Sequence, residues 1–158
     1  NGHGGDFQAG FWSIYLDQHF GHQMGATPDG RHKGEMLSRN NVATAGCGKE
    51  GPTALMNSNL KLDQTKCEDG HIMDVILPVS KMKRKDAAKH IAAILATYFD
   101  RGGQCVHLNT FDAAILREAM AHPEKYPDLI VRVSGFSAVF IELPRNVQEE
   151  LLSRVLYD

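Results

Sequence analysis

The sequence has few cysteines, little net charge and no long apolar run, and each shortage excludes a class of protein. Three cysteines, Cys47, Cys67 and Cys105, are too few and too irregularly spaced for a disulfide framework, which favours a reducing, cytoplasmic setting. The formal net charge of −2 gives no electrostatic reason to expect binding to nucleic acid or an anionic membrane. No apolar stretch approaches the roughly 20 residues needed to cross a bilayer, so we predict no membrane span.

Patterns typical of metal and nucleotide sites are also missing. His19 and His22 lie three residues apart, but no cysteine or carboxylate completes the spacing of a closed zinc site. No glycine-rich loop has the phosphate-binding spacing between a strand and a helix. We therefore predict no metal and no nucleotide, and we interpret each cysteine as a small buried apolar residue. A Ser–His–Asp assembly stays open, because folding could bring its members together, although no pattern points to one.

The composition predicts one globular domain of uneven character. The 158 residues are 42% hydrophobic and 23% charged, enough for one core. Residues 1–61 are rich in glycine and polar side chains, so we expect mostly loops there, with one or two strands and a strong turn at 27–31. An apolar patch interrupts this half at Phe11, Trp12, Ile14, Tyr15 and Leu16. The first residue is Asn1 and not Met, which suggests a chain that begins inside a longer one or was trimmed.

Residues 62–158 show the alternating pattern of an α/β fold. Apolar, β-branched runs predict strands over 71–77, ended by Pro78, over 106–110 and over 129–133. Helical spacing predicts three helices. The first covers 86–99 with Asp86 as its N-cap, and the second runs from Asp112 to before Pro123. The third follows Pro144 and has an apolar face of Val147, Leu151, Leu152 and Val155. Right-handed crossovers would place these strands side by side in parallel.

Gly135 interrupts the last apolar run, between Ser134 and Phe136. On pattern alone, a glycine beside a strand indicates a turn or bulge that needs a positive φ or close backbone approach.

The surrounding residues allow a sharper interpretation. The run Arg132-Val133-Ser134-Gly135-Phe136-Ser137-Ala138, followed by Phe140, Leu143 and Gln148, resembles the glycyl radical signature of the pyruvate formate-lyase-like glycyl radical enzymes. Segments 26–31, 51–54, 102–104 and 122–127 also resemble that family, so the likeness runs in order from about Phe11 to Arg154. Segment 51–54 and the Ser137-Ala138 pair look closer to the diol dehydratase and choline-lyase branch than to pyruvate formate-lyase.

The resemblance implies that Gly135 stores a radical on its α-carbon. Such a radical delocalises over both flanking peptides only when they lie flat together, and a β-carbon would clash in that arrangement. The implied supporting residues on the radical loop, 132–140, are Arg132, Val133, Ser134, Phe136, Ser137 and Ala138. Phe136 departs from the family's usual tyrosine, which keeps the aromatic ring but loses a hydroxyl.

The implied fold is the C-terminal share of a ten-stranded α/β barrel that encloses the radical loop. The implied partners are an activase that carries a [4Fe–4S] cluster and S-adenosylmethionine, and a catalytic cysteine in an N-terminal part or a separate chain, within a homo-oligomeric enzyme. None of the three cysteines here matches the position of that catalytic cysteine. The resemblance implies that this chain is the radical-bearing C-terminal part or subunit of a lyase or dehydratase that cleaves C–C, C–O or C–N bonds through a thiyl radical on the partner cysteine. The first alternative is a free-standing spare part that restores an oxygen-damaged formate acetyltransferase-like enzyme. The second is a non-radical assembly domain.

Overall fold

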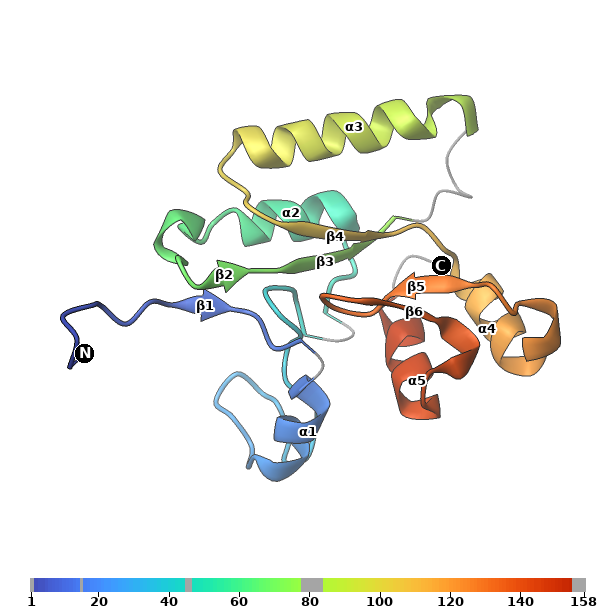
Figure 1. Cartoon of the computed structure of the whole chain (residues 1–158), viewed down its shortest axis with the longest axis horizontal. Coiled ribbons are helices and arrows are strands. Elements are labelled where there is room, and N and C mark those ends of the chain that lie inside the picture. Colours follow the sequence, from blue (N-terminus) through green and yellow to red (C-terminus); the bar gives the residue numbers. More distant parts are fainter. Residues whose placement is uncertain (1, 15, 45–46, 78–83, 155–158) are drawn as a thin grey trace.

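The computed structural model describes residues 2–14, 16–44, 47–77 and 84–154. Within these ranges, strands pair into three two-stranded sheets, surrounded by five α-helices and short 3₁₀ helices at Gln64–Lys66, Pro123–Lys125 and Phe140–Glu142. Figure 1 shows the N-terminal strand at one end of the molecule and the hairpin and helices of the C-terminal part at the other. The predicted α/β class agrees with this element order, whereas the described residues contain only small sheets.

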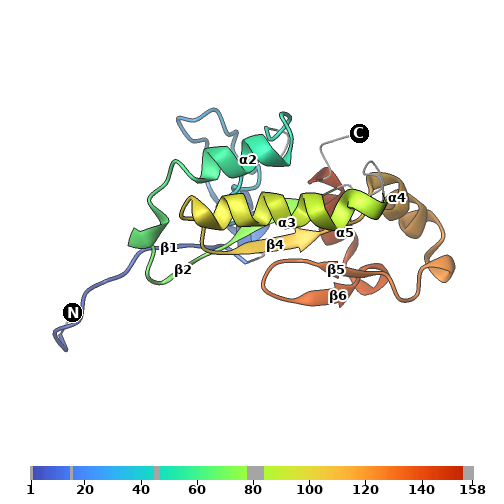
Figure 2. The ribbon, with the colours of Figure 1, turned by 90° about the horizontal axis from the view of Figure 1, so that it is seen from above.

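The central unit is a parallel strand pair with its crossover helix. Strand β3 (Met73–Ile76) pairs in parallel with β4 (Val106–Asn109), and α3 (Arg84–Asp100) runs along them beside α2 (Pro52–Asn59) (Figure 2). Every residue of β3 is buried, which matches the apolar run that predicted it. The side chains that form the core of this unit are Met56, Met73, Val75, Leu77 and Tyr98.

A second core lies between a hairpin and two helices. Strand β5 (Ile130–Arg132) pairs with β6 (Ser137–Val139), and α4 (Ala113–Ala121) and α5 (Arg145–Ser153) pack beside them. Buried apolar side chains from all of these regions meet there: Phe111, Leu116, Val131, Val133, Phe140 and Leu151. Ile76 at the end of β3 joins the same cluster, so the hairpin is fixed against the central strand pair.

The connection between β4 and β5 corrects one prediction. The parallel pairing of the first two predicted strands is confirmed, but the third, β5, pairs antiparallel with β6 and forms no ladder with β4. A side chain takes the place of that ladder: Asn109 donates from Nδ2 to the Arg132 carbonyl and accepts from the Arg132 amide, both at 2.8 Å. The two strands therefore lie close together without sharing backbone hydrogen bonds.

The first half contains more helix than its glycine content predicted. Strand β1 (Gly10–Phe11) pairs in parallel with β2 (Gly70–His71), but two eight-residue helices, α1 (Leu16–Gln23) and α2, also form. Pro52 at the first position of α2 explains its start, because proline has no amide hydrogen to lose there. The turn predicted at 27–31 is confirmed by the bond from the Gly30 amide to the Thr27 carbonyl, 3.1 Å, with Gly30 at φ +98°.

Several helix and strand boundaries differ between the prediction and the structure. The strand expected over 71–77 is split at Ile72, whose amide donates to the Phe11 carbonyl of β1 and whose carbonyl accepts from the Asn41 amide, so this residue takes no part in the β3–β4 ladder. Helix α3 begins at Arg84, which places Asp86 in its first turn and not at the N-cap. Asp112 and Pro144 do precede α4 and α5 at their N-caps, as expected, although neither side chain makes a capping bond. Expectations for Tyr15, Pro78 and Val155 lie outside the described residues.

Candidate functional site

Gly135 occupies the tip of the β5–β6 hairpin. The Val133 amide donates to the Phe136 carbonyl at 3.0 Å, so Ser134 and Gly135 form a two-residue turn. Gly135 has φ +72°, a conformation that other residues adopt at a cost of about 1–2 kcal/mol. An added β-carbon would meet no atom within 4 Å. Glycine is thus required there by its backbone conformation and not by crowding.

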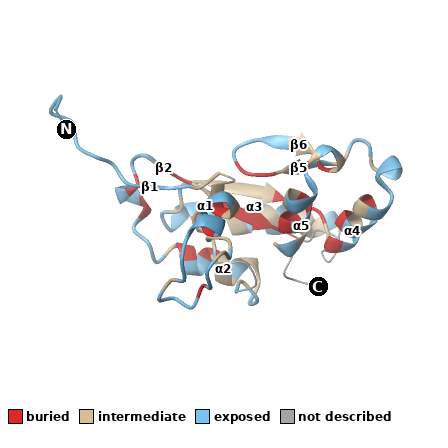
Figure 3. Ribbon diagram, turned by 90° about the horizontal axis from the view of Figure 1, so that it is seen from below, coloured by how far each residue is buried: buried red, intermediate tan, exposed pale blue. Residues whose placement is uncertain are grey.

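Burial changes abruptly within this turn. Val133 and Ser134 are buried, Ser134 completely, whereas Gly135, Phe136 and Ser137 are exposed. Figure 3 shows the same change from the β5 side of the hairpin to its β6 side. The base of the turn therefore belongs to the protein interior and its tip to the surface.

The Asn40 carboxamide holds Ser134 from behind the hairpin. Its nitrogen donates to Ser134 Oγ at 2.7 Å and to Asp74 Oδ2 at 2.6 Å, and its oxygen accepts from the amides of Ser13 and Ile14. Both hydrogens and the oxygen of this amide are thus used. Asn40 itself has φ +47°, a region that asparagine tolerates better than most residues.

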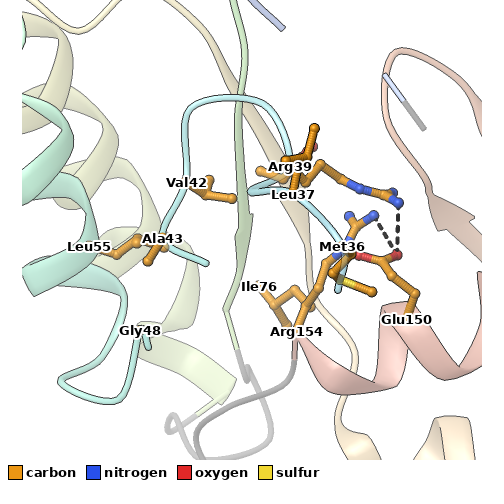
Figure 4. Close-up of a pocket in the computed structure, with 11 residues that line it drawn as sticks. Met36, Leu37, Arg39, Val42, Ala43, Gly48, Leu55, Ile76, Glu150 and Arg154 are labelled. Atoms are coloured by element: carbon orange, nitrogen blue, oxygen red, sulfur yellow. Dashed lines mark hydrogen bonds and ion pairs between the residues drawn. The ribbon is translucent and has the colours of Figure 1, made fainter. Parts of the chain in front are cut away.

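An ion cluster holds the residue before Ser134. Arg154 donates from Nη1 to the Val133 carbonyl at 2.9 Å, and its other nitrogens contact the two oxygens of Glu150 at 2.7 and 2.8 Å. Arg39 lies 3.2 Å from Glu150 Oε2, the same oxygen that Arg154 Nη2 contacts (Figure 4). Arg39 also pairs with Asp17. Burial raises the pKa of Glu150 to about 8, and the Arg39 guanidinium opposes that rise. The bidentate Arg154 contact also favours the ionised carboxylate.

His107 on β4 is the group nearest to the Gly135 amide. Its Nδ1 lies 3.2 Å from Asp74 Oδ1 and 3.5 Å from the Gly135 nitrogen. One ring nitrogen is either a donor or an acceptor, so it cannot serve the carboxylate and the amide together. Burial raises the pKa of Asp74, and Asn40 and His107 oppose that rise by favouring the ionised form. The shorter contact to Asp74 is charge-assisted, which leaves the Gly135 amide only loosely held.

The remaining predicted loop residues support the hairpin itself. Arg132 donates to Ser137 Oγ at 3.4 Å across the β5–β6 pair. Ser134 bonds to a side chain and not to the neighbouring backbone. Ala138 packs against the second core, opposite Val131. Phe136 lines a cleft of about 450 Å³ beside α1 and α5, so its ring faces outward from the hairpin.

The three cysteines differ in their surroundings. Cys67 is buried, as expected, and Cys105 is partly buried, but Cys47 is exposed, so its expected burial is wrong. Burial and the nearby Asp74 carboxylate raise the pKa of the Cys105 thiol, which disfavours the thiolate. Over the described residues, no group of three or more metal-ligating side chains is present, and no helix is long and apolar enough to cross a membrane.

Sequence patterns did not point to the side chains that hold the turn. Asn40, Asp74 and His107 come from three separate segments, and Glu150 and Arg154 from a fourth. Asp74 was visible only as a polar interruption of an apolar run, and His107 only as the alternate residue of a strand. Their common function depends on distances that only the folded chain creates.

Three comparisons with known proteins agree. A family model described as "Glycine radical" matches residues 37–141. Indoleacetate decarboxylase of Tractidigestivibacter scatoligenes is 37% identical over 139 residues, covering 87% of this chain and 16% of that protein. (2S)-3-sulfopropanediol dehydratase of Klebsiella oxytoca is 33% identical over 155 residues, covering 96% of this chain and 19% of that protein.

The solved structures extend the match to the fold. The glycerol-bound B12-independent glycerol dehydratase of Clostridium butyricum superimposes with a TM-score of 0.87 at 38% identity, over 98% of this chain and 20% of that one. The chain thus spans about a fifth of the length of these relatives. The family model covers most of the chain and includes the turn around Gly135. The chain therefore belongs to the glycyl radical family.

Proposed function

We propose that residues 1–158 are the C-terminal radical domain of a glycyl radical lyase or dehydratase, and that Gly135 carries the radical. The observation that supports this assignment best is the placement of Gly135: exposed, at φ +72°, with open space around its α-carbon, inside the matched region. The enzyme would cleave C–C, C–O or C–N bonds. Relatives named as a decarboxylase and a dehydratase support C–C and C–O cleavage, respectively.

The α-carbon of Gly135 is suited to lose one hydrogen atom. A separate activase, with its [4Fe–4S] cluster and S-adenosylmethionine, would supply the chemistry that removes it. The resulting radical is most stable when both flanking peptides are coplanar, which requires rotation from φ +72° toward an extended backbone. Glycine alone moves between these conformations without steric cost.

The radical domain must then present Gly135 to two partners in turn. The activase needs access to the α-carbon, whereas a partner cysteine, in a segment or chain beyond this one, needs it close and shielded from oxygen. Hydrogen-atom transfer from the cysteine thiol to the Gly135 radical would generate a thiyl radical that attacks substrate. The exposed tip and buried base of the turn are compatible with such a movement.

Electron paramagnetic resonance tests the assignment. After anaerobic activation of the protein with its cognate activase, the unaltered protein should show a doublet, because one α-hydrogen remains on a glycyl radical. Gly135→Ala should show no glycyl doublet. The control is Gly102→Ala, since Gly102 also has a positive φ, +95°, and open space around it. The control carries the same backbone strain, about 1–2 kcal/mol, and should keep the doublet.

Two results would refute the assignment: a doublet that persists in Gly135→Ala, or none in the activated unaltered protein. A spare-part role is distinguished by the mass of the native complex, because a radical domain of one enzyme co-purifies with its cysteine-bearing part. The likeness to relatives over 96–98% of the chain, ahead of the radical turn as well as around it, favours the enzyme domain.

A further inference from the structure

The radical turn is held at its base by two side chains and almost free at its tip. Asn40 fixes Ser134 Oγ at 2.7 Å, and Arg154 fixes the Val133 carbonyl at 2.9 Å. Among the contacts of the described residues, the Gly135 amide approaches only His107 Nδ1, at 3.5 Å. Asp74 competes for the same ring nitrogen. Control over the position of the turn is therefore concentrated at residues 133 and 134.

The contacts that hold Ser134 and Val133 both depend on two consecutive residues, Arg39 and Asn40. Asn40 contacts Ser134 directly, and its neighbour Arg39 contacts Glu150, whose two oxygens hold Arg154 in place. The side chains of Arg39 and Glu150 are only 5% and 3% exposed, so this arrangement is shielded from water. Hydrogen bonds to charged groups in such surroundings are stronger than those between neutral groups.

The segment that carries Arg39 and Asn40 is itself fixed on two sides. Arg39 pairs with the buried Asp17 of α1, and the Asn40 amide donates to Ser13 Oγ at 2.9 Å. These contacts place Arg39 and Asn40 between the N-terminal part of the chain and the β5–β6 hairpin. A displacement of this segment would loosen the contacts of Ser134 and Val133 together.

We propose that Arg39 and Asn40 are positioning residues that latch the base of the radical turn, Asn40 through Ser134 and Arg39 through Glu150 and Arg154. This inference rests on the proposed function of Gly135. The latch holds the base of the turn, Val133 and Ser134, in its buried position and sets the equilibrium between that position and the one reached by an activase. Its bonds are made by side chains and not by the strand ladder, so they can break while the β5–β6 pairing remains.

If these contacts act as a latch, weakening them should increase both the rate of activation and the rate of radical decay in air. Asn40→Gly removes the carboxamide and suits the observed φ of +47°, and Arg154→Gln removes the charged donor to Val133. Each variant should raise the rate of activation and shorten the lifetime of the doublet in air, by about five-fold for one neutral hydrogen bond and more for the charged one. Mere structural damage would slow activation as well.

A second readout needs no radical. Hydrogen exchange, followed by mass spectrometry on the unactivated full-length protein, should show faster exchange of the peptide spanning residues 132–140 in both variants. Ser134→Ala removes the same bond as Asn40→Gly from the other side and gives the same test if the glycine variant fails to fold. This measurement stays valid even if the unaltered protein never shows a doublet, which would refute only the proposed function.

Two variants serve as matched controls. Arg145→Gln alters an exposed arginine of α5, the helix that carries Glu150, and this arginine pairs only with Glu149 in the contacts described. Asn57→Ala alters an exposed asparagine that contacts Arg101. Neither should change activation, doublet lifetime or exchange of the turn. The latch is refuted if Asn40→Gly or Ser134→Ala leaves exchange of 132–140 at the unaltered rate, or if activation slows in every latch variant.

Discussion

At the scale of single residues, two separate requirements for glycine coincide at Gly135. Backbone geometry requires glycine because φ is positive, and radical chemistry requires it because the α-carbon must become planar between two peptides. Phe136 and Ser137 next to it are exposed, while Ser134 is completely buried. The α-carbon that we propose to react therefore lies at the boundary between the protein interior and its surroundings.

Oxygen should reveal the radical position by cutting the chain there. Because oxygen adds to a carbon-centred radical and the product breaks the backbone, air exposure after activation should yield a large fragment ending near Ser134. Intact-mass spectrometry of the activated protein before and after air exposure measures this. Unactivated protein treated in the same way is the control and should stay whole. Activated protein that also stays whole would contradict Gly135 as the radical residue.

At the scale of elements, the hairpin depends on two amide side chains, those of Asn109 and Gln148. Asn109 replaces a strand ladder between β4 and β5, and Gln148 of α5 donates to the Phe140 and Leu143 carbonyls, each at 3.0 Å. Side-chain amides thus satisfy backbone groups wherever the hairpin leaves regular pairing, as buried polar groups require. The orientation of the turn follows from these bonds as much as from strand pairing.

Replacing Asn109 tests this dependence. Asn109→Ala would leave the Arg132 amide and carbonyl without their partners beside a buried site, so we expect a loss of about 1–3 kcal/mol in unfolding free energy. Urea unfolding of the protein measures the loss. Asn57→Ala, at an exposed asparagine, should cost less than about 0.5 kcal/mol. Equal stability of the two variants would show that Asn109 does not connect the strands.

At the scale of the whole molecule, the chain exposes surfaces typical of an incomplete fold. The described strands form only two-stranded sheets with open edges, and large apolar side chains are exposed at Phe7, Phe11, Trp12, Phe20, Ile130 and Phe136. Open edges and apolar patches favour association with another chain segment. The relatives are about five times longer than this chain, so such a segment is available in each of them.

Expressed alone, residues 1–158 should therefore aggregate or form oligomers. Light scattering coupled to gel filtration measures the mass distribution, and coexpression with the cysteine-bearing part should restore a single species. A chain that is a monodisperse monomer with one cooperative unfolding transition would contradict this prediction. It would also strengthen the spare-part alternative, because a free-standing carrier must be stable alone.

The sequence by itself determined the family, the α/β class and the position of Gly135. The radical motif is contiguous, and helices and strands after residue 62 depend on local periodicity, so each could be recognised without distances. The order of the predicted strands and helices in that half is confirmed. The helices of the first half were missed because α1 and α2 are short and lie in a glycine-rich context.

Only the tertiary structure decided how the turn is held. The bond of Asn109 to Arg132, that of Asn40 to Ser134 and that of Arg154 to Val133 join residues that are 21 to 94 positions apart. No periodic pattern records such distances, because polar side chains at isolated positions look the same whether they face solvent or a buried partner. The chain thus specifies locally the glycine that we propose as the radical residue, and through its fold how firmly the turn around it is held.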